Sequence, residues 1–408
     1  MSTTAVGLEH GLPSHRRFPT LDGYRAIAAL MVLTTHVAFT SGLVWQQPWL
    51  GAITSRLDGG VTVFFLLSGF LLYRPWALAA MTGRSGPGLA RFWWRRAMRI
   101  FPAYWAMVCF TLLLLPEIQP VGVQVWATYL PLVHIYLPQA SVEGLTQIWS
   151  LATEVAFYAV LPLLARLAGR AGRGDPDRSA RAQLVALALV AAGSWAFTVA
   201  RAAGGLGNDL NVAYWLPGFL DWFAIGMAFA VVSARLSLPG PPRMMSGLER
   251  LADDVPTCLA AAGLVFLVVC TPLGGPYAFE LGSSWTTVLK HLLYGVAAAL
   301  LLAPGLLGHP DRGRWRHGLM SRPMVWLGTI SYGIFLWHLV LLRLTLEVLD
   351  WPPFGGRFLA LWIITVALSA AVAWLSWKVL EAPLQRLSHR WPPARRPRAT
   401  TAGQPATR

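Results

Sequence analysis

Charged residues are scarce in this chain. Of its 408 residues only 12% are charged, whereas 55% are hydrophobic. Soluble domains average about 25% charged residues, so the composition excludes an ordinary soluble globular protein. It predicts instead an all-α, polytopic membrane protein whose apolar segments cross a bilayer as helices.

Lysine is almost absent. Lys290 and Lys378 are the only lysines, so arginine carries almost all of the net charge of +15. The arginines fall in short segments between apolar runs, which is typical of the cytoplasmic loops of membrane proteins. No polar stretch is long enough to form a soluble module with a basic face, so nucleic-acid binding is not expected.

Cysteine is rare as well. Cys109, Cys258 and Cys270 lie within apolar runs at unrelated spacings. This pattern favours small buried side chains over a disulfide or a metal site. The chain also lacks Walker, HExxH, GxSxG and paired CxxC motifs, so no metal and no tightly bound cofactor is predicted.

Ten apolar runs are long enough to span a bilayer. They lie near residues 21–43, 59–80, 99–116, 147–166, 181–203, 215–236, 256–273, 285–307, 324–347 and 357–380. A shorter run at 121–138 is interrupted by Gln124, Pro131 and His134. Counting it as a span would place the arginine-rich loop 166–181 opposite to every other basic loop. We therefore expect ten spans, with 121–138 at the outer face and both termini in the cytoplasm.

Three segments follow from this topology. Residues 1–20 form a cytoplasmic N-terminal segment without the apolar region of a removable signal, so the first helix is expected to stay in the protein. Residues 21–383 form one transmembrane domain. Residues 384–408 are rich in proline and arginine and are predicted to be a disordered cytoplasmic tail.

The first apolar run contains an arginine and a histidine. Arg25 and His36 are eleven positions apart. This separation is about three helical turns, so both side chains lie on one stripe, ~16 Å apart along the axis. Ionisable groups inside a membrane cost several kcal/mol and usually mark a functional site.

A second cluster precedes the third apolar run. Arg91, Arg95 and Arg99 are spaced one turn apart, and Arg96 is adjacent. Guanidinium groups bind phosphate oxygens through two hydrogen bonds, so this face suits a polyphosphate at the cytoplasmic surface. A topology anchor with interfacial aromatic residues fits the spacing equally well.

The fourth run presents a polar stripe. Ser150, Glu154 and Tyr158 are spaced four residues apart and share one helix face. Glu154 is ~18 Å from Arg166 along the axis, which places it at the depth of His36, near the middle of the bilayer.

The same estimate along the helix axis places Asp221 ~21 Å from Arg235 and His338 ~24 Å from Arg322. Both residues are therefore predicted at a depth comparable to that of His36 and Glu154. Together with His36 and Glu154 they predict one functional level in the membrane. A buried structural network of polar residues is the alternative.

Five segments in this order resemble the motifs of the acyltransferase 3 family of multispanning membrane O-acyltransferases. They are Leu21–Arg25 leading to His36, 60–70, 95–105, 149–158 and 331–338, within residues 20–385. One position departs from the family: the acidic residue that commonly follows Gly-Val in the second helix is Thr62 here. Asp58, one turn earlier, could partly replace it.

The resemblance implies transfer of an acyl group, with acetyl expected, from cytoplasmic acyl-CoA to a hydroxyl group. The acceptor would be a cell-envelope glycan, a glycolipid or a secondary metabolite, and the location a bacterial plasma membrane. Some relatives carry a fused extracytoplasmic esterase-like domain that completes the transfer. Its absence here implies a stand-alone enzyme or a separate extracytoplasmic partner protein.

The resemblance also implies residue roles. His36 would be the general base or the first acyl acceptor, and Glu154 would orient the imidazole or activate the acceptor. Arg25 would hold the thioester carbonyl or a CoA phosphate. The other phosphate ligands would be Arg95, Arg96 and Arg99, with supporting roles for Ser150, Tyr158, Asp221 and His338.

A transporter or proton-coupled exporter is the main alternative, because mid-membrane histidine and glutamate are equally natural there. Such proteins usually show internal repeats and paired broken helices, and neither is visible in this sequence. The arginine cluster also suits a bound polyphosphate better than the passage of a solute.

Overall fold

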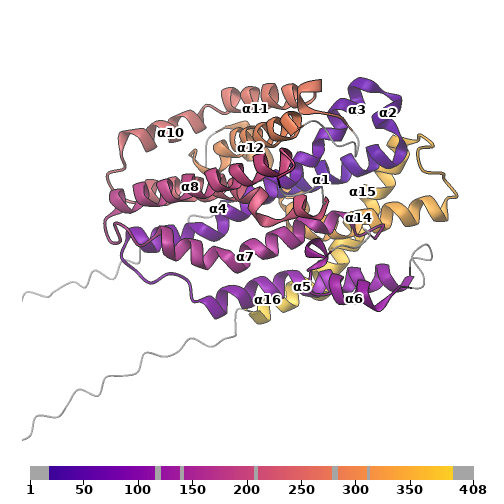
Figure 1. Cartoon of the computed structure of the whole chain (residues 1–408), viewed down its shortest axis with the longest axis horizontal. Helices are drawn as coiled ribbons and strands as arrows, with labels where there is room; N and C mark the ends of the chain where they lie inside the picture. Colours follow the sequence, from indigo (N-terminus) through magenta and orange to yellow (C-terminus); the bar gives the residue numbers. More distant parts are fainter. Residues whose placement is uncertain are drawn as a thin grey trace, which may run out of the picture.

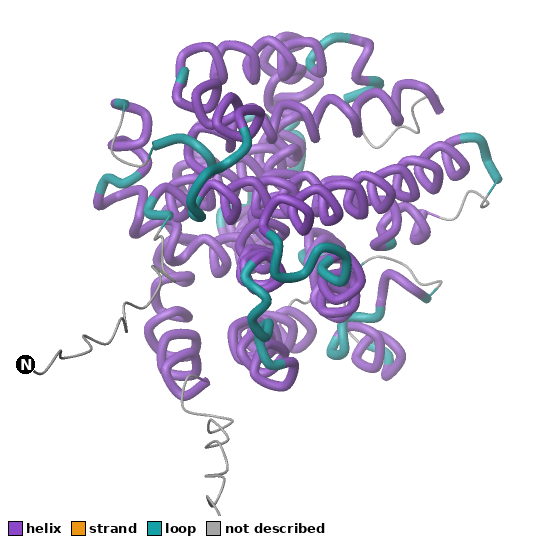
Figure 2. Tube along the Cα trace, turned by 90° about the vertical axis from the view of Figure 1, so that its left-hand side faces the viewer, coloured by secondary structure: helices purple, strands orange, loops and turns teal. Residues whose placement is uncertain are grey.

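The computed structural model describes residues 18–114, 121–137, 142–205, 210–277, 284–309 and 313–388. These ranges are predominantly helical and contain no strand. Most helices run roughly along the long axis of the molecule (Figure 1), and from one end several are seen nearly end-on, packed side by side (Figure 2). The predicted all-α fold is confirmed for the described residues.

The helices follow one another along the chain. They are α1 (Thr20–Ser41), α2 (Leu43–Gln46), α3 (Pro48–Ser55), α4 (Gly60–Met81), α5 (Leu89–Leu114), α6 (Val123–Tyr129), α7 (Trp149–Ala168), α8 (Pro176–Ala202), α9 (Leu220–Leu236), α10 (Arg243–Asp253), α11 (Val255–Val269), α12 (Ser284–Leu306), α13 (Arg314–Leu319), α14 (Arg322–Val348), α15 (Phe358–Ser376) and α16 (Ala382–Ser388).

Eight helical segments in the described ranges are long and apolar enough to cross a membrane. A ninth appears if α10 and α11, bent by 79° at their junction, count as one span. Helix α1 has 22 residues, but Arg25 and His36 lower its hydropathy and it is not among the eight. A multispanning membrane protein is therefore supported, whereas the count of ten spans stays a prediction.

The arginine-rich connections gather at one end of the bundle. Five contacts join them there: Gly174 N–H to the Ala80 carbonyl (2.9 Å), Arg173 to the Arg84 carbonyl (2.7 Å), Arg235 to Asp177 (2.7 Å), Arg316 to Asp253 (3.0 Å) and Thr20 to the Gly305 carbonyl (3.1 Å). These residues lie near helix termini or, for Arg316, in the short helix α13, so the connections 82–88, 169–175 and 237–242 and the residues 307–309 and 313–321 occupy the same end. We call this the basic end.

The other connections meet at the opposite end. Gly356 N–H donates to the Ser41 carbonyl (2.9 Å), Arg56 donates to the Gly275 carbonyl, and the Trp215 indole donates to the Ile135 carbonyl (2.9 Å). The long helices therefore alternate in direction between the two ends.

Segment 121–137 is not a membrane span in this structure. It contains α6, which has seven residues and rises only ~10 Å, whereas a span needs ~20 residues. The Tyr104 hydroxyl of α5 donates to the Tyr129 carbonyl and ties the segment to the outer half of α5. The segment folds back at one end of the bundle, as the charge pattern predicted.

Helix α5 begins at Leu89, ten residues before the apolar run predicted at 99–116. Its first turns are amphipathic, and the Trp93 indole donates to the Tyr158 carbonyl of α7 (3.1 Å). This contact fixes the arginine-bearing turns of α5 beside the polar stripe of α7.

Two glycines allow α4 and α9 to pack with their backbones nearly in contact. A Cβ added to Gly69 would lie 2.3 Å from the Phe223 carbonyl oxygen, and one added to Gly226 would lie 2.0 Å from the Leu66 carbonyl oxygen. Small residues at helix interfaces are typical of membrane bundles, where close packing replaces the hydrophobic driving force.

The C-terminal boundary differs from the prediction. Residues 384–388 belong to α16, whose Ala382 and Ser388 are buried, so helix continues past the expected start of the tail. The remainder of the predicted tail (389–408) and most of the N-terminal segment (1–17) lie outside the described residues.

Candidate active site

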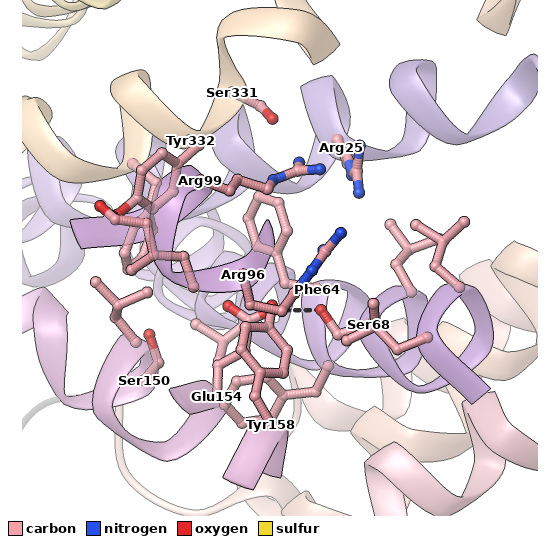
Figure 3. Close-up of a pocket in the computed structure, with 18 residues that line it drawn as sticks. Arg25, Phe64, Ser68, Arg96, Arg99, Ser150, Glu154, Tyr158, Ser331 and Tyr332 are labelled. Atoms are coloured by element: carbon pink, nitrogen blue, oxygen red, sulfur yellow. Dashed lines mark hydrogen bonds between the residues drawn. The ribbon is translucent and has the colours of Figure 1, made fainter. Parts of the chain in front are cut away.

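A small cavity lies between α1, α4, α5, α7 and α14, with a volume of about 80 Å³. We call it the arginine pocket. Its polar lining comes from residues that the sequence had singled out and from three further hydroxyl residues, Ser68, Ser331 and Tyr332: together they are Arg25, Ser68, Arg96, Arg99, Ser150, Glu154, Tyr158, Ser331 and Tyr332. Figure 3 shows these side chains converging from separate helices.

Three guanidinium groups meet in this pocket. Arg25 comes from α1, and Arg96 and Arg99 from α5 (Figure 3). Arg25 is 3.5 Å from Asp22, whereas neither Arg96 nor Arg99 forms an ion pair with a carboxylate in the described part of the chain. Positive charge therefore exceeds negative charge in the pocket, which favours a bound anion.

Glu154 is the carboxylate of the arginine pocket. Its Oε1 accepts hydrogen bonds from the Ser68 hydroxyl of α4 and from the Tyr158 hydroxyl of its own helix (2.6 Å). Arg96 lies close enough to Tyr158 and Glu154 to interact electrostatically. The predicted stripe of Ser150, Glu154 and Tyr158 does face one cavity, and Ser68 is a partner that the spacing analysis missed.

Arg95 does not line this pocket. Its Nε atom is buried and has no hydrogen-bond partner among the described residues. On a helix Arg99 points between its two neighbours, about 40° from Arg95 on one side and about 60° from Arg96 on the other, and the pocket lies on the Arg96 side.

A larger cavity of about 410 Å³ adjoins the first, and Val61 lines both. We call it the outer chamber, because its walls include Arg56 and Gly275 at the end opposite the basic end. Its polar lining comprises Thr35, His36, Ser55, Arg56, Asp58, Thr198, Arg201, Thr286, Thr287, Lys290 and His291. Aromatic residues complete it: Phe39, Trp149, Tyr214, Phe219, Trp222, Tyr277 and Tyr294.

His36 faces the outer chamber and is not among the residues lining the arginine pocket. Its ring centroid is 5.2 Å from that of His338, which is fully buried on α14. Nδ1 of His338 is 2.8 Å from the Phe335 carbonyl oxygen, so this nitrogen carries the proton. Nε2 is then a buried acceptor, and it has no partner among the described residues.

Glu154 and His36 thus line different cavities, and no hydrogen bond joins them. Depth along the helices predicted one functional level for His36, Glu154, Asp221 and His338. The structure groups them otherwise: Glu154 belongs to the arginine pocket, His36 pairs with His338, and Asp221 has a partner of its own.

That partner is His291 of α12, which the sequence analysis overlooked. Its Nε2 is 3.0 and 2.9 Å from the two carboxylate oxygens of Asp221 on α9. The sequence did contain an indication of this site, because His291 and Lys290 are ionisable residues within an apolar run long enough to span a membrane. Asp58 near them forms an ion pair with Lys290 (3.2 Å) and accepts a hydrogen bond from the Tyr294 hydroxyl.

The sequence model of one protein family, described as an acyltransferase domain, matches residues 18–378. The chain belongs to the acyltransferase 3 family. It is an acyltransferase, and the transporter alternative gains no support. The match covers both cavities and every residue named above as lining them.

Curated relatives agree with this family. The chain is 30% identical to the acyltransferase MdmB of Streptomyces mycarofaciens, over 96% of either chain. It is 28% identical to the putative peptidoglycan O-acetyltransferase YrhL of Bacillus subtilis, and 25% identical to the peptidoglycan O-acetyltransferase OatA of Listeria monocytogenes. The alignments with these two cover 92% and 91% of this chain but only 56% of each relative. No solved structure matches this chain.

Proposed function

We propose that this protein is a plasma-membrane O-acyltransferase that moves an acyl group, with acetyl expected, from acyl-CoA to a hydroxyl group on the other side of the bilayer. The observation that carries the proposal is the position of the arginine pocket. It opens between helices whose basic connections gather at one end, and it adjoins the outer chamber at Val61.

The orientation follows from charge. In this proposal the basic end is cytoplasmic, because arginine-rich loops are retained on that side of a bacterial plasma membrane. Ten helices then cross the bilayer, namely the eight apolar segments, the bent pair α10–α11, and α1 shielded by its neighbours. Both ends of the transmembrane domain face the cytoplasm.

Acyl-CoA is the donor in this proposal. Arg96 and Arg99 bind its phosphate oxygens, and Arg25 binds a phosphate or the thioester carbonyl. A volume of about 80 Å³ admits only part of a CoA molecule, so the nucleotide lies toward the basic end while the acyl end points to Val61. Arg95, which does not line the pocket, contributes only to the electrostatic potential at the pocket entrance.

His36 accepts the acyl group. A ring nitrogen attacks the thioester carbon, an N–C bond forms, the C–S bond breaks, and CoA leaves as the thiol with the proton from the ring. Two observations support this role. His36 lines the outer chamber. The His338 ring lies next to the His36 ring, and its unpartnered Nε2 can accept a hydrogen bond or a proton. Glu154, held by Ser68 and Tyr158, positions Arg96 against the donor.

The acceptor belongs in the outer chamber. Its aromatic walls suit the apolar faces of a ring, and its polar groups suit hydroxyls, which is the usual composition of a small-molecule site. The names of two relatives make a peptidoglycan sugar one reasonable acceptor. A secondary metabolite with a ring-borne hydroxyl would satisfy the same chemistry.

The donor site provides the test. Replacing Arg96 and Arg99 together with glutamine should weaken acetyl-CoA binding at least tenfold, because a charge-assisted hydrogen bond contributes ~1.5–3 kcal/mol and ~1.4 kcal/mol is tenfold in affinity. Calorimetric titration of the purified protein with acetyl-CoA gives the dissociation constant, and thiol release gives the turnover.

The matched control replaces Arg170 and Arg178, two exposed arginines at the basic end, with glutamine. This variant loses two positive charges, as the Arg96 and Arg99 variant does, but its substitutions lie outside the arginine pocket. It should bind acetyl-CoA with the affinity of the unmodified protein. Equal affinity in all three proteins would contradict the proposed donor site.

A further inference from the structure

Asp221 and His291 form an aspartate–histidine pair that the transfer of an acyl group from donor to His36 does not use. The side chains are 4% and 10% exposed, and Nε2 of His291 contacts both carboxylate oxygens. A carboxylate oxygen accepts hydrogen bonds, so Nε2 is the ring nitrogen that carries the proton toward Asp221; in the tautomer with this single proton, Nδ1 has the free lone pair.

The imidazole is held firmly in this orientation. Its ring stacks on Trp222 with centroids 4.2 Å apart and planes inclined by 12°. The Trp222 indole donates to the backbone carbonyl of His291 (3.2 Å), and Ser194 donates to Asp221 (3.2 Å). Position, tautomer and ring plane are therefore all fixed by contacts between α8, α9 and α12.

The pair opens onto the outer chamber. His291 lines this cavity, as do Trp222 and His36, whereas none of the three lines the arginine pocket. Nδ1 of His291 makes no hydrogen bond within the described ranges, and it is not among the buried unpartnered atoms. A basic nitrogen thus faces the cavity in which His36 would present its acyl group.

We infer that His291, oriented by Asp221, is the general base for the acceptor hydroxyl. This inference rests on the proposed function and adds the base for its second step. Nδ1 of His291 takes the hydroxyl proton, and the oxygen bonds to the acyl carbon on His36. The C–N bond breaks, its electron pair returns to the His36 ring, and that ring recovers the proton from His291. Asp221 is a positioning residue, because it acts through His291.

The surrounding charges support a base at this place. Lys290 next to His291 is paired with Asp58, and the Tyr294 hydroxyl also donates to Asp58. The carboxylate of Asp58 is therefore engaged, which leaves Nδ1 of His291 as an unoccupied acceptor on this side of the chamber. Trp149 and Tyr214 stack 4.8 Å apart in the same chamber, and Phe219 lies between Trp149 and His291, with ring centroids 5.3 and 5.9 Å away, so a hydroxyl-bearing ring could bind against this aromatic group beside His291.

Two measurements test the inference. The first is turnover of acetyl-CoA by the purified protein, with water as the acceptor hydroxyl and CoA thiol as the product. His291→Gln should reduce turnover about 10²–10⁴-fold, the usual loss when a general base is removed. Asp221→Asn, which keeps the shape of the side chain, should lower kcat at least about tenfold while KM for acetyl-CoA stays the same.

The second measurement does not depend on turnover. Diethyl pyrocarbonate acylates unprotonated imidazole nitrogens, and peptide mass spectrometry locates the product. His291 should be modified despite its 10% exposure, at a lower rate in Asp221→Asn, whereas fully buried His338 should resist. His317, exposed and outside both cavities, is the reference for reagent activity, and His317→Gln is the matched control for turnover.

The possible failures are distinguishable. Unchanged turnover in His291→Gln, or a His291 that the reagent does not modify, overturns the assignment of the base and leaves the donor site intact. No CoA release from the unmodified protein, with arginine variants that bind acetyl-CoA normally, overturns the proposed function and the base with it. If His291→Gln fails to fold, the turnover of Asp221→Asn and the chemical modification of His291 test the assignment of the base.

Discussion

An imidazole nitrogen inside a helix bundle loses the hydration it had in water, and without a hydrogen-bond partner that loss is not recovered. Nε2 of His338 is such an atom, and its ring lies 5.2 Å from His36. Packing alone gives no reason to keep this arrangement, because an apolar residue of similar size would fill the space at lower cost. A chemical role for the pair gives a reason.

His36→Ala should abolish acyl transfer because it removes the proposed acyl acceptor, and Glu154→Gln should lower it because the charge that positions Arg96 is lost, while both proteins remain folded. Within the described residues His36 makes no hydrogen bond that its removal would break, and glutamine at position 154 can still accept from Ser68 and Tyr158. CoA release measures the activity, and size-exclusion chromatography in detergent checks that the protein is monodisperse.

A purely structural network would behave differently. In a purely structural role neither side chain takes part in the reaction, so both folded variants would keep normal turnover. If both residues serve one reaction, the double variant should be little worse than either single one. A stable His36→Ala protein with normal turnover would exclude this histidine, and His338 would be the next candidate.

Local spacing was enough to find some site residues and not others. Glu154 and Tyr158 are one turn apart, and Arg96 and Arg99 are three residues apart, so helical geometry places each pair on a common face. Asp221 and His291 are 70 residues apart on different helices, and no local period encodes their contact. For the same reason the sequence could not show that His36 and Glu154 line separate cavities.

At the scale of helices, the contact between α4 and α9 holds the site together. Phe65 of α4 lines the arginine pocket and stacks on Phe223 of α9, with ring centroids 4.5 Å apart. Ser68, the partner of Glu154, follows on α4, and Asp221 lies at the start of α9. The spacing of these two helices therefore determines both cavities.

Gly226→Ala should destabilise the protein by ~1–3 kcal/mol, the usual cost of adding a methyl group to a well-packed interior. The new Cβ would lie 2.0 Å from the Leu66 carbonyl oxygen, which belongs to the backbone and cannot rotate away. Thermal unfolding in detergent, followed by circular dichroism, should show a lower midpoint and a loss of turnover.

Gly263→Ala is the matched control. This glycine lies within α11, and a Cβ there would have no heavy atom within 4 Å. Alanine should be neutral or slightly stabilising at this position, because it favours helix more than glycine does. An equal loss of stability in both variants would mean that helix packing at Gly226 is looser than the structure indicates.

The whole molecule has an asymmetric distribution of charge. The arginine-rich connections gather at one end, and α6 with segment 121–137 lies near Trp215 toward the other. The sequence predicted that the arginine-rich connections share one end, whereas the side of the membrane that this end faces stays a prediction. Helix bounds were less accurate: the early start of α5 and the continuation into α16 depend on packing against neighbouring helices, which hydropathy does not describe.

Single cysteines at position 137 and position 170 should be labelled from opposite sides of the membrane, in a background from which Cys109, Cys258 and Cys270 have been removed. Leu137 and Arg170 are both exposed, so each thiol can react. Position 137 follows α6 near the end opposite the arginine-rich connections, and position 170 follows α7 at the basic end. Intact cells treated with a membrane-impermeant maleimide should label the first cysteine only, and opened membranes should label both. Labelling of position 170 alone in intact cells would place the basic end outside, as a crossing by segment 121–137 would require, and labelling of both cysteines would mean that α7 does not cross the bilayer.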